Sequence, residues 1–190
     1  MRAEDVEDAV TMLVAALEAV PDDGWSPPAG PLEWSCRDTV VHVADDLIGY
    51  AGQVAIAPPD GYAPFDVAVD PATGTAGLLR VVEAGGALLA AAVRTSPPGV
   101  RGWHPYGDSD AAGFAAMGVT EVLVHTHDIT RATAPSWALP PGPCRAVLAR
   151  LWPGVDPGTD PGATLLHHTG RAPLDGVPAP SRWRWHGAPA

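Results

Sequence analysis

Apolar residues recur every three or four positions in four long segments of the chain, which is the spacing of the buried face of an α-helix. No segment of similar length alternates apolar and polar residues as a half-buried strand would. The pattern therefore predicts an all-α protein built on a four-helix bundle. The expected helices cover residues 4–20, 35–57, 72–95 and 110–133.

The ends of these segments carry helix start and stop signals. Ser35, followed three residues later by Asp38, is typical of an N-terminal cap, and proline follows each expected helix within a few residues. Gly85 and Gly86 fall inside the third segment, where two glycines would weaken or kink a helix. The loops are longer than a minimal bundle needs, and long ordered loops often roof a pocket.

The composition changes after residue 135, where proline and glycine become dense. Only residues 144–152 have the pattern of one further, short helix. We therefore divide the chain into a metal-binding helical bundle, residues 1–135, and a C-terminal extension, residues 136–190, that packs on the bundle. The residues expected to anchor the extension are Leu165, Leu166, Trp183 and Trp185.

Charge and composition exclude several classes of partner. The formal net charge is −11, and all 11 basic residues are arginine. Such an acidic chain does not suit a nucleic-acid backbone or an anionic membrane, which both need a positive surface. The N-terminus lacks the features of a secretory signal, no apolar run approaches the roughly 18–20 residues of a membrane span, and Cys36 and Cys144 match no metal or redox spacing. We expect a cytoplasmic protein, a monomer or a homodimer.

The fourth expected helix contains the segment TEVLVHTHD, residues 120–128. On a helical wheel, Glu121, His125 and Asp128 share one stripe with core-type apolar residues, while His127 lies on the other side. Buried charges usually pair with each other or bind a metal. A Glu and a His four residues apart also occur as an ordinary surface pair, or with the histidine in the core, so this motif alone is weak.

The second expected helix contributes His42. Its apolar residues cluster on the side opposite His42, whose own stripe carries Asp38, Asp46 and Gln53. Two interpretations fit this pattern: His42 faces solvent, or the polar stripe lines a wet cleft between helices, where an open metal site would lie. Periodicity does not choose between them.

Two motifs together resemble a known family. The first has the pattern W-x8-W-S-x-R-D-x3-H, and the second has the pattern E-x3-H-x2-D on the fourth helix. Both are similar to signatures of the mycothiol-dependent maleylpyruvate isomerase-like family, which belongs to the DinB-like superfamily of metal- and thiol-dependent enzymes. The resemblance also extends to the closing pieces LLHHTGRAPL and WRWHG. The motif residues are Trp25, Trp34, Ser35, Arg37, Asp38 and His42 for the first motif and Glu121, His125 and Asp128 for the second.

The resemblance implies a DinB-like four-helix bundle in which His42, Glu121 and His125 bind a divalent metal, usually zinc. It also implies that mycothiol or a similar thiol is a cosubstrate, which the metal activates for attack on a small electrophile. The activity would then be that of an S-transferase or an isomerase. The extension here is shorter than the C-terminal domain of the true isomerases, which weakens the case for that particular isomerisation.

Two His and one Glu leave at least one position open on a four- or five-coordinate zinc ion, as in catalytic sites, and a thiol that coordinates zinc loses its proton. Zinc, nickel and iron all accept these ligands. Hydrogen bonds from behind would orient the ligands. By spacing, Asp128 would support His125 and Asp46 would support His42, although Asp128 could instead pair with Arg131.

Other polar residues are weaker candidates. His104 and Tyr106 precede the fourth helix and could bind substrate, but incidental aromatic residues of a capping loop are more common. Cys36, in the first turn of its helix, could be a nucleophile, but a packed bystander fits better. The remaining candidates are assigned no site: they are Arg80, Arg94, Arg101, His167, His168 and His186.

Two other functions stay open on the sequence. The same fold could serve as a non-catalytic binding or scaffold protein, which the polar stripe around His42 slightly favours. Alternatively, a water molecule in the open metal position would make the protein a metal-dependent hydrolase.

Overall fold

The computed structural model describes residues 1–133 and 137–189, and within these residues it contains six helices and no strand. The predicted all-α class is thus confirmed. Each of the four long helices begins and ends within three residues of its expected bounds. The helices are α1 (Ala3–Leu17), α2 (Cys36–Ile56), α3 (Thr75–Thr95), α4 (Ala111–Thr133), α5 (Pro141–Leu151) and α6 (Pro161–His168).

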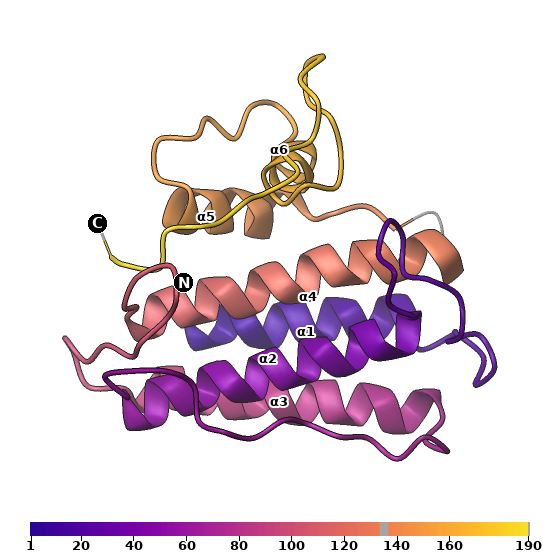
Figure 1. Ribbon diagram of the computed structural model, residues 1–190, viewed down its shortest axis with the longest axis horizontal. Coiled ribbons are helices and arrows are strands. Elements are labelled where there is room, and N and C mark those ends of the chain that lie inside the picture. The colour runs from indigo at the N-terminus through magenta and orange to yellow at the C-terminus, as the bar shows by residue number, and fades with distance from the viewer. Residues whose placement is uncertain (134–136, 190) are drawn as a thin grey trace.

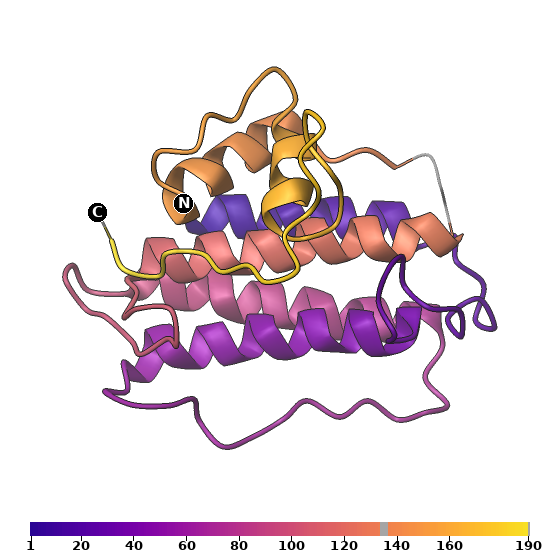
Figure 2. The ribbon, with the colours of Figure 1, turned by 45° about the horizontal axis from the view of Figure 1, so that its top comes forward.

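The four long helices form a bundle in which α1 and α2 lie on one diagonal and each contacts both α3 and α4 (Figures 1 and 2). Residues 57–74 run along the length of the bundle between α2 and α3, so these two helices point in the same direction (Figure 1). A hydrogen bond from the Val67 amide to Asp45 Oδ1, 2.7 Å long, ties this crossing segment to α2. The arrangement places α2 beside both α3 and α4.

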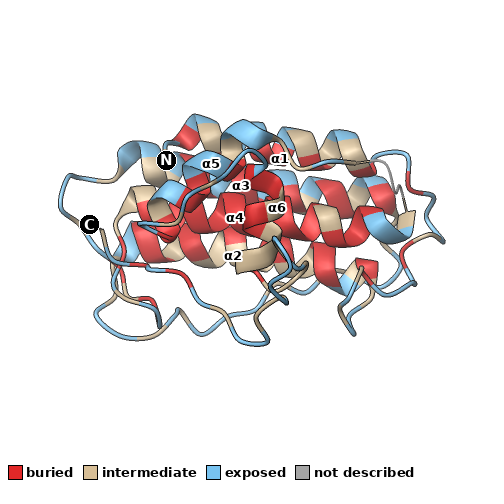
Figure 3. Ribbon diagram, turned by 90° about the horizontal axis from the view of Figure 1, so that it is seen from above, coloured by how far each residue is buried: buried red, intermediate tan, exposed pale blue. Residues whose placement is uncertain are grey.

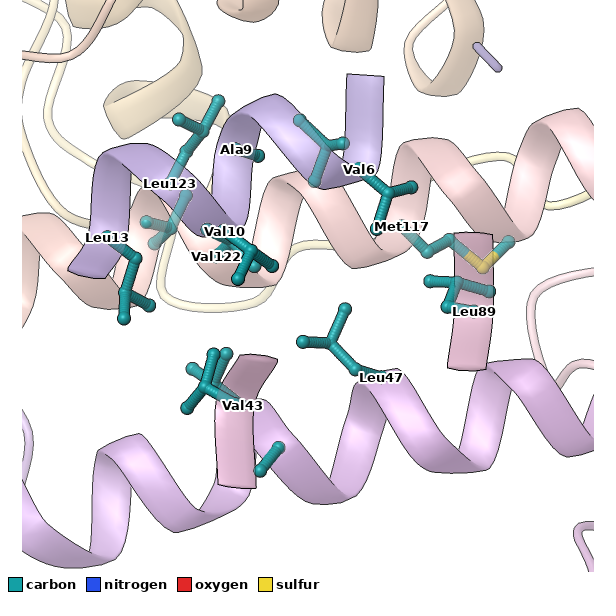
Figure 4. Close-up of a cluster of buried hydrophobic side chains, with 14 of the residues drawn as sticks. Val6, Ala9, Val10, Leu13, Val43, Leu47, Leu89, Met117, Val122 and Leu123 are labelled. Carbon is teal, nitrogen blue, oxygen red and sulfur yellow. The ribbon is translucent and has the colours of Figure 1, made fainter. Parts of the chain in front are cut away.

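The core lies between the four helices, and α4 is its most deeply buried member (Figure 3). Leucine and valine side chains of α1 and α2 meet those of α3 and α4 in the middle of the bundle (Figure 4). Because each fully buried leucine contributes roughly 1.5–3 kcal/mol, this apolar contact holds α2 against α4. Phe114, Leu13, Leu47, Leu89 and Met117 are all fully buried.

Close helix packing explains the two glycines inside α3. The helix passes through Gly85 and Gly86 without interruption, so the two glycines, which were expected to weaken or kink α3, do not break it. A Cβ atom on Gly86 would lie 2.6 Å from Val10 Cγ2, and one on Gly85 would lie 3.1 Å from the Ala44 carbonyl oxygen. The glycines therefore let α1 and α2 approach α3 closely.

We expect Gly86→Ala to destabilise the fold although alanine is the better helix former. The added methyl group would collide with Val10, and overpacking of this kind costs about 1–3 kcal/mol. Gly52 on α2 has open space around it, so Gly52→Ala should instead stabilise the fold by up to about 1 kcal/mol. Urea unfolding of both variants measures the difference. Equal effects in the two variants would contradict the packing argument.

Helix capping agrees with the sequence in α2 but reveals a helix that the sequence analysis missed. The Asp38 amide donates a hydrogen bond to Ser35 Oγ at 3.0 Å, as expected for the N-terminal cap of α2. The missed helix is α6, where Asp160 accepts a 3.0 Å hydrogen bond from the Ala163 amide and Pro161 occupies the first turn. The Asp-Pro pair was its sequence signal.

Other residues of the first motif fix the ends of the neighbouring helices. The buried Trp25 donates its indole N–H to Thr75 Oγ1 at 2.7 Å, at the start of α3. The Arg37 guanidinium donates to the carbonyl oxygens of Asp70 and Thr73, at 2.6 and 2.8 Å. These contacts hold the beginning of α3 against the beginning of α2.

The residues after α4 fold back over it. Helix α5 packs on α4, α6 packs on α5, and the last residues cross back toward the loop before α4 (Figures 1 and 2). Ser109 Oγ donates to the Gly187 carbonyl at 2.6 Å, and the Gly187 amide donates to the Tyr106 carbonyl at 3.0 Å. Of the four expected anchors, Leu165 and Trp185 are buried, and Leu166 and Trp183 are half-buried. A division into domains at residue 135 stays a prediction.

Among the described helices, only α3 is long and apolar enough to cross a membrane by length and composition. Its buried face packs against α1 and α2 inside the bundle, so its apolar character has a structural explanation. The cytoplasmic location expected from the sequence stays a proposal.

Candidate metal centre

Three potential ligand side chains from α2 and α4 converge between these helices. The Nε2 atom of His125 lies 3.1 Å from Glu121 Oε2, and the Nε2 atom of His42 lies 3.9 Å from the same oxygen. One ligand atom from each of the three residues lies within 4.8 Å of the other two. The fold thus brings together the three residues that the sequence analysis singled out for a metal.

His42 lines a cleft and is neither in the core nor free in solvent. Its side chain is 31% exposed, and its ring lies between those of Trp34 and His125, with centroid distances of 5.0 and 5.2 Å. The structure therefore favours the second interpretation of the polar stripe on α2. Burial is the main cause that lowers the pKa of His42, and the charge of Glu121 only partly opposes it, so the ring is neutral near pH 7. A neutral imidazole is the form that binds a metal.

His125 is oriented from behind. Its Nδ1 atom lies 3.0 Å from Asp128 Oδ2, and because this carboxylate accepts the hydrogen bond, Nδ1 carries the proton. The Nε2 atom then faces the Glu121 carboxylate, and two electron-rich atoms at 3.1 Å need a proton or a cation between them. The donor set therefore fits a divalent metal, with the Nδ1 hydrogen bond in the position that orients a ligating histidine.

Without a metal, that place is taken by a proton. Burial lowers the pKa of His125, but hydrogen bonds to Asp128 and Glu121 and the charges of these carboxylates outweigh it and raise the pKa to about 9. A metal must displace this proton.

The metal-free protein is therefore expected to lose stability as the pH rises from about 6.5 to about 9. A folded-state pKa above the unfolded value of 6.5 means that the folded chain binds more protons, so this contribution is complete below pH 6.5 and is lost as the pH rises through about 9. Asp46 acts in the same direction, because its pKa is also raised to about 9. Thermal unfolding of the metal-free protein across this range measures the effect. A constant or rising Tm would contradict it, and His125→Gln should flatten the decrease.

Asp46 approaches the triad from the side of the cleft. Its Oδ2 atom lies 3.1 Å from His42 Nε2, the nitrogen that also faces Glu121. The sequence predicted only that Asp46 would support His42, one turn away, and did not specify the ring nitrogen. Since the one-turn spacing leads the carboxyl group into the cleft, Asp46 stands beside the candidate metal position. Burial and the charge of Glu121 raise its pKa to about 9, so in the metal-free protein it is a neutral carboxyl group that can donate to His42.

Arg171 completes the support of the triad and was not predicted from the sequence. Its Nη2 atom donates to Asp128 Oδ2 at 3.0 Å, and Asp128 is fully buried. Burial alone would raise the pKa of Asp128, but the hydrogen bonds and charges of His125 and Arg171 lower it. Arg171 also donates to the Thr169 carbonyl at 2.7 Å and lies 5.8 Å from the ring centre of Trp183. The expected partner Arg131 is exposed.

The triad opens into a cleft of ≈ 570 Å³ between the bundle and the C-terminal residues. Aromatic rings dominate its walls and come from three separate parts of the chain. His104 and Tyr106, the weaker candidates of the loop before α4, do line this cleft. Its aromatic residues other than histidine are Trp34, Tyr50, Tyr106, Trp183 and Trp185.

The remaining polar candidates lie away from the triad. Arg94 pairs with Glu7 at 2.9 Å on the surface, and Arg80 and Arg101 are exposed. Cys36 is buried, and this burial raises the pKa of its thiol, which opposes a role as nucleophile.

A comparison with family models agrees with the fold and the motifs. Residues 4–130, which include both motifs, match the model described as the mycothiol maleylpyruvate isomerase N-terminal domain. No curated protein matches the chain. The match ends before Arg171 and before the two indole rings, Trp183 and Trp185, on the C-terminal side of the cleft.

Proposed function

Because the chain belongs to the mycothiol maleylpyruvate isomerase N-terminal domain family, we propose that it is a metal-dependent thiol S-transferase or isomerase. In this proposal a small thiol of the mycothiol type and a small electrophile meet in the cleft beside His42, Glu121 and His125. The observation that carries it is the convergence of three ligand atoms within 4.8 Å at the base of an open, aromatic cleft.

The three side chains would hold the metal, which we take to be zinc. A divalent cation bound there would lower the pKa of a coordinating thiol, so that the thiolate predominates near pH 7. Two imidazoles and one carboxylate leave room for such a thiol, whereas a structural zinc site is closed by four protein ligands. Asp128 and Arg171 would keep the ring of His125 in one tautomer and one orientation.

The chain's own groups would then manage the substrate and the proton. Asp46 lines the cleft beside His42. The charge of a bound metal would displace the proton of Asp46, and the resulting carboxylate would accept the proton that the thiol loses. The sulfur lone pair forms a bond to the electrophilic carbon. In a transfer, the leaving group departs with its bonding electrons and takes up the proton. In an isomerisation, the sulfur adds to a double bond, the adduct rotates, and the sulfur leaves again with the electron pair.

Zinc content and thiol dependence test this function. We expect about one zinc ion per chain after metal supplementation, and consumption of an alkyl halide only when mycothiol or a small surrogate thiol is present. Turnover that is equal with and without thiol would point to the hydrolase and overturn the proposal. Sub-stoichiometric zinc that His42→Ala leaves unchanged would overturn both enzymatic functions and leave the scaffold protein.

A further inference from the structure

A second cavity of ≈ 510 Å³ adjoins the cleft of the candidate metal centre. Asp46 and Tyr50, one turn apart on α2, line both spaces. The other wall of the second cavity is the segment that crosses along the bundle between α2 and α3. We call this cavity the acidic compartment; it is lined by Asp45, Asp46, Gly49, Tyr50, Tyr62, Ala63, Pro64, Phe65 and Asp66.

The described lining of the acidic compartment contains three aspartates and no positively charged side chain. One oxygen of Asp45 accepts the Val67 amide, which holds the carboxylate in place at the wall. Asp66 is exposed on the opposite wall. The described lining of the adjoining cleft contains one arginine, Arg171, whose guanidinium donates to Asp128. The net charge of −11 adds to the attraction for cations over the whole surface.

Tyr50 points to a ligand independently of these acids. The side chain is 4% exposed, and its ring packs against Phe114 with a centroid distance of 5.8 Å. Its hydroxyl group has no hydrogen-bond partner among the described residues, yet the residue lines both the cleft and the acidic compartment. Burial and the charges of Asp46 and Glu121 raise its pKa, so the hydroxyl keeps its proton. The hydroxyl oxygen is not itself fully buried, so a molecule bound in these cavities could supply its hydrogen-bond partner.

Two aromatic rings at the mouth of the compartment suit a positively charged nitrogen. Tyr62 and Phe65 are 42% and 47% exposed, and both line the acidic compartment. A cation over such a ring is attracted by about 0.5–1 kcal/mol at an exposed site. Exposed aromatic faces beside carboxylates are a combination that binds organic ammonium groups.

We propose that the acidic compartment binds a positively charged nitrogen of the electrophilic substrate, with Tyr50 at the junction between this nitrogen and the reacting carbon. The inference rests on the proposed function for the identity of the site, and it names the class of substrate: small organic ammonium compounds, in preference to carboxylates. The cationic group would occupy the space among Asp45, Asp66 and the two exposed rings. The reactive carbon would reach the triad past Asp46.

Binding of three simple probes tests the charge preference without any turnover. Benzylammonium, benzyl alcohol and benzoate have similar size and differ in charge, and calorimetric titration of the zinc-supplemented protein measures their affinities. We expect benzylammonium to bind about tenfold more tightly than benzyl alcohol, and benzoate to bind more weakly than either. Equal affinities for the three probes, or a preference for benzoate, would overturn the proposal.

Variants locate the cation. Asp66→Asn and Asp45→Asn should each weaken benzylammonium binding by about threefold to tenfold and leave benzyl alcohol unchanged. The amide oxygen of the Asp45 variant can still accept the Val67 amide, which preserves the crossing segment. Glu83→Gln on the exposed side of α3 removes the same charge outside both cavities and is the control. An equal effect of Glu83→Gln would show that only net charge matters and would overturn the compartment.

Turnover then separates the two possible sources of the ammonium group. In the first series, a cationic and a neutral benzyl halide each react with 2-mercaptoethanol as the thiol. In the second series, the neutral benzyl halide reacts either with 2-mercaptoethanol or with cysteamine, which carries the ammonium group on the thiol. The proposal requires that the charge on the halide raise kcat/KM by about tenfold and that Asp66→Asn reduce this gain. A gain from the charge on cysteamine alone would assign the compartment to the thiol and overturn our inference. If the wild-type protein binds benzylammonium but shows no thiol-dependent turnover, the proposed function is contradicted and the charge preference of the compartment is not.

Discussion

His125→Ala is expected to remove zinc binding and thiol-dependent turnover together. Binding free energies of about 10–16 kcal/mol, shared among three or four ligands, give a loss of about 10²–10⁴-fold in zinc affinity for one ligand. His125 is also the ligand candidate with the most support, since both ring nitrogens meet a carboxylate oxygen at 3.0–3.1 Å. Competition with a chromogenic chelator measures the affinity, and the thiol-dependent assay measures the turnover.

The neighbouring residue His127 provides the matched control. It belongs to the same helix and the same nine-residue segment, but it is not part of the triad. His127→Ala should therefore keep zinc affinity within about threefold of the wild-type value. Should both alanine variants keep zinc, the ion would have to bind elsewhere, and the triad would lose its assigned role.

Arg171→Met is expected to destabilise the protein and to weaken zinc binding, although residue 171 touches no candidate ligand. The arginine side chain is 9% exposed and donates to a carboxylate that is fully buried. Removing one partner of a buried ion pair costs about 3–5 kcal/mol. Disturbing a group that orients a metal ligand costs about 10–100-fold in metal affinity. Chemical unfolding and chelator competition measure the two effects.

The double variant Asp128→Asn with Arg171→Met separates charge from orientation. Removing both charges should restore much of the stability, because no isolated buried carboxylate is left. The amide oxygen can still accept the proton of His125 Nδ1, so zinc affinity should exceed that of Arg171→Met alone. If Arg171→Met alone keeps the stability and zinc affinity of the wild type, the role given to Arg171 is refuted.

The sequence predicted the four long helices and the residues of the triad, but only the resemblance joined His42 to α4. The periodicity of α2 places His42 opposite the apolar residues, which describes the packing of one helix alone. The cleft beside it is built by α4 and by the C-terminal residues, so its existence depends on contacts between distant segments. A wheel therefore cannot distinguish a residue in a cleft from one on the outer surface.

Arg171 could not be paired with Asp128 from the sequence for the same reason. These residues are 43 positions apart, and the local spacing rule pointed to Arg131, one turn away. Helix α6, which comes just before Arg171, is eight residues long, too short for a clear period. Its Asp-Pro start was the only local signal. Asp46 shows the opposite limit, because a correct one-turn spacing did not reveal which ring nitrogen it would meet.

The C-terminal residues supply the guanidinium behind Asp128 and two of the indole walls of the cleft, all beyond the region that matches the family model. A fragment that stops after α4 would thus retain every candidate ligand but would lack the C-terminal wall of the cleft. By the same logic, relatives that share these helices but end in unrelated tails could diversify their chemistry without altering a single ligand. The helices would supply the shared metal ligands, and each C-terminal segment would supply its own walls of the cleft.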